Sequence, residues 1–177
     1  MKRPFIPEDA PFTGDQKSWL SGFLAGMQSA KAMTGNQASV AGASTAPMLN
    51  ILYGTQTGNA EGLAMDAAVA ARAQGFEAVV QGLDDVTIDA FSAMKRVIIT
   101  IATYGEGEMP DNAGLFWESI YSADMPKLPD MQFGVLALGD TSYDEFCQAG
   151  KLLDIRLEQL GATRLIDRLD CDVDYED

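Results

Sequence analysis

Histidine is absent from this sequence of 177 residues, and cysteine is scarce. Without an imidazole group, Ser-His-Asp catalysis, histidine-based acid–base chemistry and histidine-containing metal sites are excluded for this chain acting alone. The two cysteines, Cys147 and Cys171, form no CxxC motif, so the sequence indicates neither a zinc site nor a dense disulfide framework. We therefore expect no bound metal.

Long apolar runs are also missing. No stretch reaches the length that is needed to span a bilayer. Prolines and acidic residues interrupt the first 11 positions, where a signal peptide would need an apolar segment. We therefore expect a cytoplasmic protein that does not enter a membrane.

Positive charge is the third scarcity. The chain has 12 lysine and arginine residues against 26 aspartate and glutamate residues, which gives a formal net charge of −14. Such a surface repels nucleic acid and anionic lipid, and it favours basic protein partners. The alternative interpretation is that the excess acid only keeps the protein soluble.

The first 45 residues are expected to form an N-terminal helix and a flexible linker. Within "TGDQKSWLSGFLAGMQSAKAM", large apolar residues recur at helical spacing, and Thr13 or Asp15 is a candidate cap. These apolar residues are Trp19, Leu20, Phe23, Leu24 and Met27. The following "TGNQASVAGASTAP" is small, polar and uncharged, which is typical of a flexible linker. The helix could pack on the rest of the chain, or it could mediate oligomerisation or bind a partner.

Residues 46–177 alternate between apolar runs and helical patterns. The runs "MLNILY", "EAVVQ", "RVIITIA" and "QFGVLAL" suit strands that are covered on both faces, and "ATRLIDRLD" is a fifth candidate. Helices are expected over 59–74, 88–94, 113–122 and 146–160. The alternation predicts an α/β fold: a doubly wound, five-stranded parallel sheet with an N-terminal helical extension. No helical pattern follows the fifth strand, so we expect a domain that is truncated before its final helix.

The segment between the first strand and the first helix of this sheet, "NILYGTQTGN", predicts an anion-binding loop. Gly54 and Gly58 permit tight turns, and hydroxyl and amide side chains lie between and after them. The helix N-terminus that follows favours a phosphate without any cation. The Walker lysine and the dinucleotide fingerprint GxGxxG are both missing, which favours a monophosphate over a triphosphate or pyrophosphate. An ordinary strand-to-helix turn is the alternative.

Two further loops follow strands and should lie at the same edge of the sheet. They are "ATYGEGEMPDNAG" over 102–114 and "LGDTSYDEFCQAG" over 138–150. Each carries a tyrosine, Tyr104 and Tyr143, next to small or flexible residues. Two aromatic rings on adjacent loops can stack on either side of a flat heterocycle and exclude water from it. Together with the phosphate loop, they predict a planar, phosphorylated cofactor.

Three segments resemble the flavodoxin-type FMN domain of diflavin reductases. They are "YGTQTGNAE", "ATYGEGEMPDNA" and "LGDTSYDEFCQAGKLLDIRLEQLGATRLIDRLDCDVDYED", and in order they cover about residues 48–177. The last segment is especially similar to the flavoprotein (alpha) component of NADPH-dependent sulfite reductase. The amino-terminal "FTGDQKSWLSGFLAG" also resembles the short helix that precedes the domain in that group.

The resemblance implies a role for each matching position. Residues 55–60 would wrap the FMN phosphate, and residues 102–105 would line one side of the isoalloxazine, with Tyr104 stacking on it. Residues 138–147 would line the other side, with Tyr143 as the second stacking ring and Cys147 either packing against the cofactor or simply buried. Asp172 falls where the family brings a late acidic residue close to the flavin. The expected cofactor-binding residues are Thr55, Gln56, Thr57, Gly58, Asn59, Ala60, Ala102, Thr103, Tyr104, Gly105, Leu138, Gly139, Asp140, Thr141, Ser142, Tyr143, Phe146, Cys147 and Asp172.

The resemblance also implies an electron route from NADPH to FAD, then to FMN, and then to an acceptor protein. Only the FMN stage would reside in this chain, so an FAD/NADPH reductase domain and a hemoprotein acceptor are the expected partners. Tyr104 departs from the sulfite reductase branch, where glutamine is frequent, and matches cytochrome-reducing diflavin enzymes. The alternatives are therefore a cytochrome-reducing diflavin reductase, a stand-alone flavodoxin carrier, or an interaction module that acts through its N-terminal helix.

Acidic residues crowd the two tyrosine-bearing loops. Their carboxylates would disfavour an anionic reduced flavin, and they would steer a basic acceptor toward the flavin edge. The acids concerned are Glu106, Glu108, Asp111, Asp140, Asp144 and Glu145. Taken singly, each could be no more than a solvated loop residue.

Overall fold

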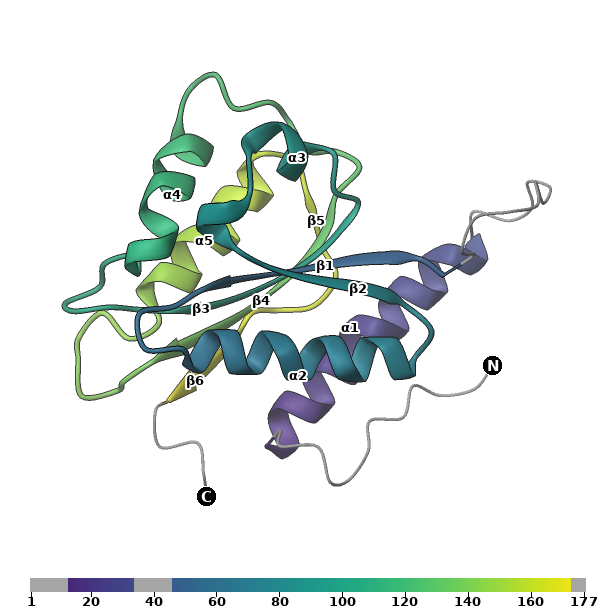
Figure 1. Cartoon of the computed structure of the whole chain (residues 1–177), viewed down its shortest axis with the longest axis horizontal. Helices are drawn as coiled ribbons and strands as arrows, with labels where there is room; N and C mark the ends of the chain where they lie inside the picture. Colours follow the sequence, from purple (N-terminus) through teal and green to yellow (C-terminus); the bar gives the residue numbers. More distant parts are fainter. Residues whose placement is uncertain (1–12, 34–45, 173–177) are drawn as a thin grey trace.

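The computed structural model describes residues 13–33 and 46–172. A parallel sheet runs through the middle of the molecule, with helices on both faces (Figure 1). Its strands are β1 (Met48–Gly54), β2 (Glu77–Gly82), β3 (Arg96–Ala102), β4 (Gln132–Gly139), β5 (Thr163–Arg164) and β6 (Leu169–Asp172). The helices are α1 (Gly14–Met33), α2 (Asn59–Ala73), α3 (Ile88–Ser92), α4 (Gly114–Tyr121) and α5 (Gln148–Gln159), with short 3-10 turns η1 (Leu83–Asp85) and η2 (Asp111–Ala113). Within these residues no helix is long and apolar enough to cross a membrane.

The strand order is β2-β1-β3-β4-β5, and β6 pairs with β4 beyond β5 along the chain. All strand pairs are parallel. The chain leaves β1 toward one neighbour and β3 toward the other, so the order reverses between β1 and β3. Ligands of such open sheets bind beyond the carboxyl ends of the strands at this reversal.

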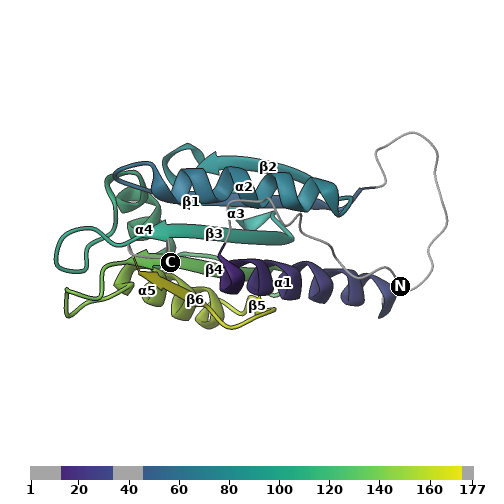
Figure 2. The same cartoon turned by 90° about the horizontal axis from the view of Figure 1, so that it is seen from below.

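Two apolar clusters form the core, one on each face of the sheet. Buried residues of α1 and α2 pack on one face, where α2 presents alanines such as Ala64 and Ala68 that bring it close to β1 and β3. Buried residues of α3, α4 and α5, among them Phe91, Phe116 and Leu153, pack on the other face. Figure 2 shows the same division from below. The sheet is therefore covered on both faces, which explains why its central strands read as continuous apolar runs.

Helix α1 packs on the protein's own sheet. Its N-terminus is capped by Thr13, whose hydroxyl accepts from the Gln16 N–H while the Gln16 side chain accepts from the Thr13 N–H, at 3.3 and 3.1 Å. The five apolar residues predicted from helical spacing are all buried, and Phe23 lies directly on Gly134 of β4. A Cβ atom on Gly134 would come within 2.7 Å of the Phe23 ring, so only glycine permits this contact. The linker predicted over 34–45 lies outside the described residues.

The fifth strand differs from the prediction. A continuous strand was expected over 162–170, but the structure has two short segments, β5 and β6, which both pair with β4. The interruption has a physical cause, since the residues between the segments turn toward α1. The indole N–H of Trp19 donates to the Asp167 carbonyl at 2.8 Å, and Ile166 lies against Gly22. Helix α1 thus covers the sheet at β4 and β6, where the sequence offered no later helix.

Candidate functional site

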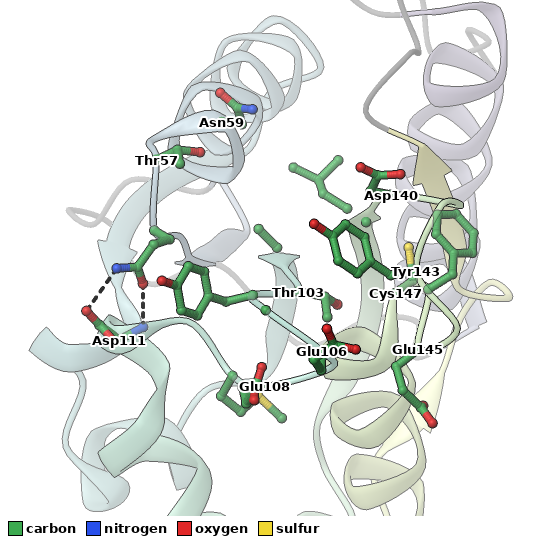
Figure 3. A pocket seen from close by; sticks show the side chains of 18 residues that line it. Thr57, Asn59, Thr103, Glu106, Glu108, Asp111, Asp140, Tyr143, Glu145 and Cys147 are labelled. Atoms are coloured by element: carbon green, nitrogen blue, oxygen red, sulfur yellow. Dashed lines mark hydrogen bonds between the residues drawn. The ribbon is translucent and has the colours of Figure 1, made fainter.

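Three loops enclose a cavity of about 760 Å³ at the carboxyl ends of β1, β3 and β4. This volume lies within the range of about 300–1,000 Å³ that is usual for small-molecule and cofactor sites. Figure 3 shows Thr57 and Asn59 on the side of α2, and Asp140, Tyr143 and Cys147 on the opposite side. The lining residues are Gln56, Thr57, Asn59, Ala102, Thr103, Tyr104, Gly105, Glu106, Glu108, Met109, Asp111, Leu138, Gly139, Asp140, Tyr143, Glu145, Phe146 and Cys147.

The loop between β1 and α2 is shaped for an anion. Gly58 adopts φ 95°, a left-handed conformation that favours glycine, and its N–H donates to the Thr55 hydroxyl at 2.8 Å. No side chain of the described residues caps α2, so the first-turn N–H groups and the helix dipole are available to a negatively charged ligand. Buried Thr100 of β3 donates to the Ala60 carbonyl at 2.8 Å and fixes the position of this helix terminus.

A second loop fastens this anion loop from the side. The Gln56 amide donates to the Asp111 carboxylate at 2.9 Å and accepts from the Asp111 N–H at 3.0 Å (Figure 3). Asn112 accepts from the Thr55 N–H at 2.7 Å and donates to the Tyr53 carbonyl at 3.4 Å. The Gln56 amide is thus engaged with Asp111, whereas the sequence had suggested it as a donor to phosphate.

The loop after β3 forms a tight turn that presents Tyr104. The N–H of Tyr104 donates to the Glu108 carbonyl and the N–H of Glu108 donates back, at 3.0 and 2.8 Å. Gly105 and Gly107 lie at φ 54° and 129°, values that favour glycine. A Cβ atom on Gly107 would lie 2.8 Å from Cβ of Glu145, so this turn contacts the loop after β4. The turn therefore sets the spacing between the two tyrosine-bearing loops.

The loop after β4 depends on a close approach at Gly139. A Cβ atom there would lie 2.6 Å from the backbone nitrogen of Cys147. Cys147 adopts φ 56°, so the helix predicted from residue 146 begins at Gln148 instead, because a left-handed residue cannot continue an α-helix. Its thiol is fully buried, and burial, with a contribution from the Asp170 charge, raises its pKa to about 12. The Cys147 thiol is therefore neutral at physiological pH and is no nucleophile.

The cavity has aromatic faces and a purely acidic charge. Tyr104 and Tyr143 line it while about half of each side chain stays exposed, at 51% and 48%, so both rings have surface available for stacking. Five lining residues are carboxylates and none is lysine or arginine, among the residues that the structure describes. An anionic group can therefore be held only by N–H and hydroxyl donors, which are found at the α2 end. These features fit a flat ring with a phosphate tail.

Most of the predicted site residues line the cavity, and six do not. Thr55, Gly58 and Ala60 form the backbone of the anion loop and the start of α2. Thr141, Ser142 and Asp172 hold the loop after β4 from behind. The Ser142 N–H donates to Asp140 at 2.8 Å, and Asp172 accepts from the N–H of Thr141 at 3.3 Å and from its hydroxyl.

Sequence reasoning missed Met109 in the lining and Asn112 behind the anion loop. It assigned Glu106, Glu108, Asp111 and Glu145 to the acidic rim, and the structure places these four in the wall of the cavity. The position of Met109 and Asn112 in "GEMPDNAG", directly after the glycine-rich turn, was the available signal.

Comparison with known proteins gives the family. The flavodoxin family profile matches residues 51–177. The chain is 41% identical to the "Sulfite reductase [NADPH] flavoprotein alpha-component" of Bacillus subtilis, over all of this chain and 32% of that protein. It is 43% identical to the protein of the same name from Vibrio parahaemolyticus, over 93% of this chain and 27% of that protein. The chain thus spans about a third or less of the length of these relatives.

Solved structures agree. A Streptococcus pneumoniae flavodoxin superposes with a TM-score of 0.64 at 32% identity, over 71% of this chain and 84% of that one. Oxidised flavodoxin 2 from Bacillus cereus gives 0.66 at 29% identity, over 75% and 88%. The sheet order, the cavity at the strand reversal and these matches lead to one conclusion: the chain belongs to the flavodoxin family, and its cofactor is FMN.

Proposed function

We propose that this chain is the FMN domain of an NADPH-dependent diflavin reductase that delivers electrons to the hemoprotein of sulfite reductase. The carrying observation is the cavity, which combines two half-exposed tyrosines with an uncapped helix N-terminus. The relatives' name, which includes NADPH and sulfite reductase, supports the wider role. In this proposal the FAD and NADPH sites belong to other domains of a longer protein, and residues 46–177 form the FMN unit that follows an N-terminal helical segment.

The chain's residues would hold the cofactor at both ends. The N–H groups at the start of α2, with Thr57 and Asn59, would bind the phosphate. Tyr104 and Tyr143 would stack on the ring and exclude water from it. Bound FMN supplies the redox chemistry, because its isoalloxazine ring accepts and releases electrons. No side chain is required as an acid, base or nucleophile.

The carboxylates around the ring would tune the cofactor and select its partner. Glu106, Glu108 and Glu145 lie at the wall of the cavity, where their charge disfavours the addition of negative charge to the ring. A flavin in such a site gives up electrons more readily. The same charges attract an acceptor whose docking surface is basic.

The first experiment asks whether the purified chain binds FMN. Titration of the ligand-free protein with FMN and with riboflavin, followed by flavin fluorescence, gives two dissociation constants. We expect FMN to bind about a hundredfold or more tightly than riboflavin, because only FMN reaches the anion loop. A protein that stays colourless with FMN would overturn the proposal.

Matched threonine variants locate the phosphate. Thr57→Val removes a hydroxyl from the cavity wall, and we expect it to weaken FMN binding about tenfold while leaving riboflavin binding unchanged. Thr163→Val makes the same change at an exposed position of β5 and should alter neither constant. Equal effects of the two substitutions would contradict the assignment of the anion loop.

A second experiment identifies the acceptor. The photoreduced, FMN-loaded domain is mixed with sulfite reductase hemoprotein or with a cytochrome, and the rate of heme reduction is recorded for each. Faster reduction of the hemoprotein supports the sulfite reductase assignment. Faster reduction of the cytochrome would favour a cytochrome-reducing diflavin enzyme.

A further inference from the structure

Strand β6 is held from two sides, by β4 and by α1. It pairs in parallel with β4 from Leu136↔Leu169 to Gly139↔Asp172, and among the described residues no other strand pairs with it. Four residues in one edge ladder are a weak attachment, because few backbone hydrogen bonds oppose the entropy of the segment. The position of β6 therefore depends on what else contacts it.

Helix α1 supplies that additional contact. Its Trp19 indole donates to the Asp167 carbonyl at 2.8 Å, just before β6. Gln16, which is 1% exposed, donates to the sulfur of Cys171 at 3.8 Å. Ile166 packs against α1 at Gly22. The helix thus fixes the chain on the approach to β6 and within it.

The far end of β6 holds the loop that carries Tyr143. The Asp172 carboxylate accepts from both the N–H and the hydroxyl of Thr141, and the Cys171 carbonyl accepts from the Cys147 thiol at 3.7 Å. Thr141 and Asp172 are not in the cavity wall, whereas Tyr143 and Cys147 of the same loop are. The bonds to β6 therefore act on the position of the loop.

We propose that α1 is a positioning element of the flavin site, and that Trp19 acts through β6, Asp172 and Thr141 on the loop that presents Tyr143. This proposal rests on the FMN binding stated above. A loop that is already held in its binding conformation loses less conformational entropy when the ligand binds. When only a fraction of the molecules hold the loop correctly, the apparent dissociation constant rises by the inverse of that fraction.

Three single variants test the two ends of this connection. Asp172→Ala removes both bonds to Thr141, and we expect the dissociation constant of FMN to rise about tenfold. Asp172→Asn keeps an acceptor for the Thr141 N–H and can donate to its hydroxyl, so binding should stay within about twofold of the wild type. Trp19→Phe keeps the stacking on Phe23 but loses the bond to Asp167, and should raise the constant about threefold.

Two features separate positioning from general destabilisation. Trp117→Phe on α4 makes the same substitution at a partly buried tryptophan outside the cavity wall and should leave FMN binding unchanged. The ratio of the riboflavin and FMN constants should also stay constant in the Trp19 and Asp172 variants, since the loop contacts the ring and not the phosphate.

The double variant Trp19→Phe/Asp172→Ala tests whether both residues act through one connection. We expect it to bind FMN about as weakly as Asp172→Ala alone, because the connection is already broken. Additive effects, or equal effects of Trp19→Phe and Trp117→Phe, would overturn the proposal. Equal effects of Asp172→Asn and Asp172→Ala would assign Asp172 a direct charge effect instead. If the wild type itself fails to bind FMN, the proposed function is wrong, which is a distinct outcome.

Discussion

At the scale of the single residue, Asp111 has two opposed effects on the anion loop. Its carboxylate accepts from Gln56 at 2.9 Å and so fastens the loop, but it also places a negative charge in the cavity wall near the phosphate site. The hydrogen bond needs only an oxygen acceptor, whereas the repulsion needs the charge. The two effects can therefore be separated by an amide.

We predict that Asp111→Asn binds FMN about threefold more tightly at low ionic strength and binds riboflavin unchanged. The asparagine oxygen keeps the bond from Gln56, while the repulsion of the phosphate disappears. Titrations at about 0.02 and 0.5 M salt check this, since the gain should vanish when salt screens the charge. Asp124→Asn, which removes a charge at an exposed position outside the cavity wall, is the matched control. Weaker FMN binding by Asp111→Asn would show that fastening the loop depends on the charge.

The buried thiol of Cys147 makes stability depend on pH. Its folded-state pKa is raised to about 12, mainly by burial, while an unfolded cysteine titrates near about 8.5. Between these values the unfolded chain loses a proton that the folded chain keeps, so the free energy of unfolding falls as pH rises, by up to about 1.4 kcal/mol per pH unit. Below about pH 8 both states hold the proton, and the contribution is constant.

Urea unfolding of the wild type and of Cys147→Ala at about pH 8, 9 and 10 isolates this effect. The stability advantage of the wild type should shrink with pH by about 1 kcal/mol between pH 9 and 10. Other groups that titrate in this range, including the Cys171 thiol, whose pKa burial also raises, are present in both proteins and cancel in the difference. Parallel pH profiles of the two proteins would show that Cys147 is not shielded as the structure indicates.

At the scale of the secondary structure element, α1 should fold and unfold together with the sheet, because its apolar residues belong to the same core cluster as those of α2, β1 and β3. Gly26 lies inside this helix, and a Cβ atom there would meet nothing within 4 Å. We predict that Gly26→Ala raises the free energy of unfolding by about 0.5–1 kcal/mol, since alanine favours the helical backbone.

Chemical unfolding followed by far-ultraviolet circular dichroism checks this prediction. Gly75→Ala is the control, because space is equally open there but the residue lies at φ 85°, so alanine should destabilise by about 1 kcal/mol. The same substitution thus acts with opposite sign at two open sites. A Gly26→Ala variant with an unchanged main transition would mean that α1 unfolds separately from the sheet.

Local pattern was sufficient for most of the elements. Strands β1 to β4 were predicted to within a residue, because burial on both faces makes each a continuous apolar run. Thr13 was one of two candidate caps, and it is the observed one. The three loops at the site were also identified, because a parallel sheet brings the carboxyl ends of its strands to one edge.

The features that sequence reasoning missed depend on contacts between distant residues. The break between β5 and β6 arises from α1, and the Trp19–Asp167 bond spans 148 residues. The bonds between Gln56 and Asp111 join residues 55 apart. The segment "RLIDRL" has a strand-like pattern, but a tertiary partner decides its conformation. No periodicity in either segment indicates its partner.

At the scale of the whole molecule, charge is the dominant feature. The chain carries a formal net charge of −14, and five carboxylates line the cavity without a lysine or arginine among the lining residues. The general excess of acid affects any charged molecule that approaches. The carboxylates at the cavity act in addition on the partner that reaches the ring, so the effects of global and local charge can be measured separately.

We predict that electron transfer from the FMN-loaded protein depends on salt with a sign that is set by the acceptor. Reduction of a basic protein acceptor should slow about tenfold or more as ionic strength rises from about 0.02 to 0.5 M, because screening removes the attraction. Reduction of anionic ferricyanide should become faster over the same range, since screening removes a repulsion. Stopped-flow absorbance measures both rates on one protein sample. The same direction of change for both acceptors would contradict electrostatic steering.

Charge-matched double variants then locate the steering charges. Glu106→Gln/Glu145→Gln removes two carboxylates from the cavity wall, whereas Glu77→Gln/Asp124→Asn removes two from exposed positions outside it. Both variants have the same net charge, so a purely global effect would reduce the salt dependence equally in the two. We expect the cavity variant to lose clearly more of the salt dependence with the basic acceptor, because the attraction between close charges in the docked encounter exceeds that between charges about a Debye length or more apart. Equal losses would assign the effect to the overall charge of the molecule, and the acidic rim would then have no specific role in choosing the partner.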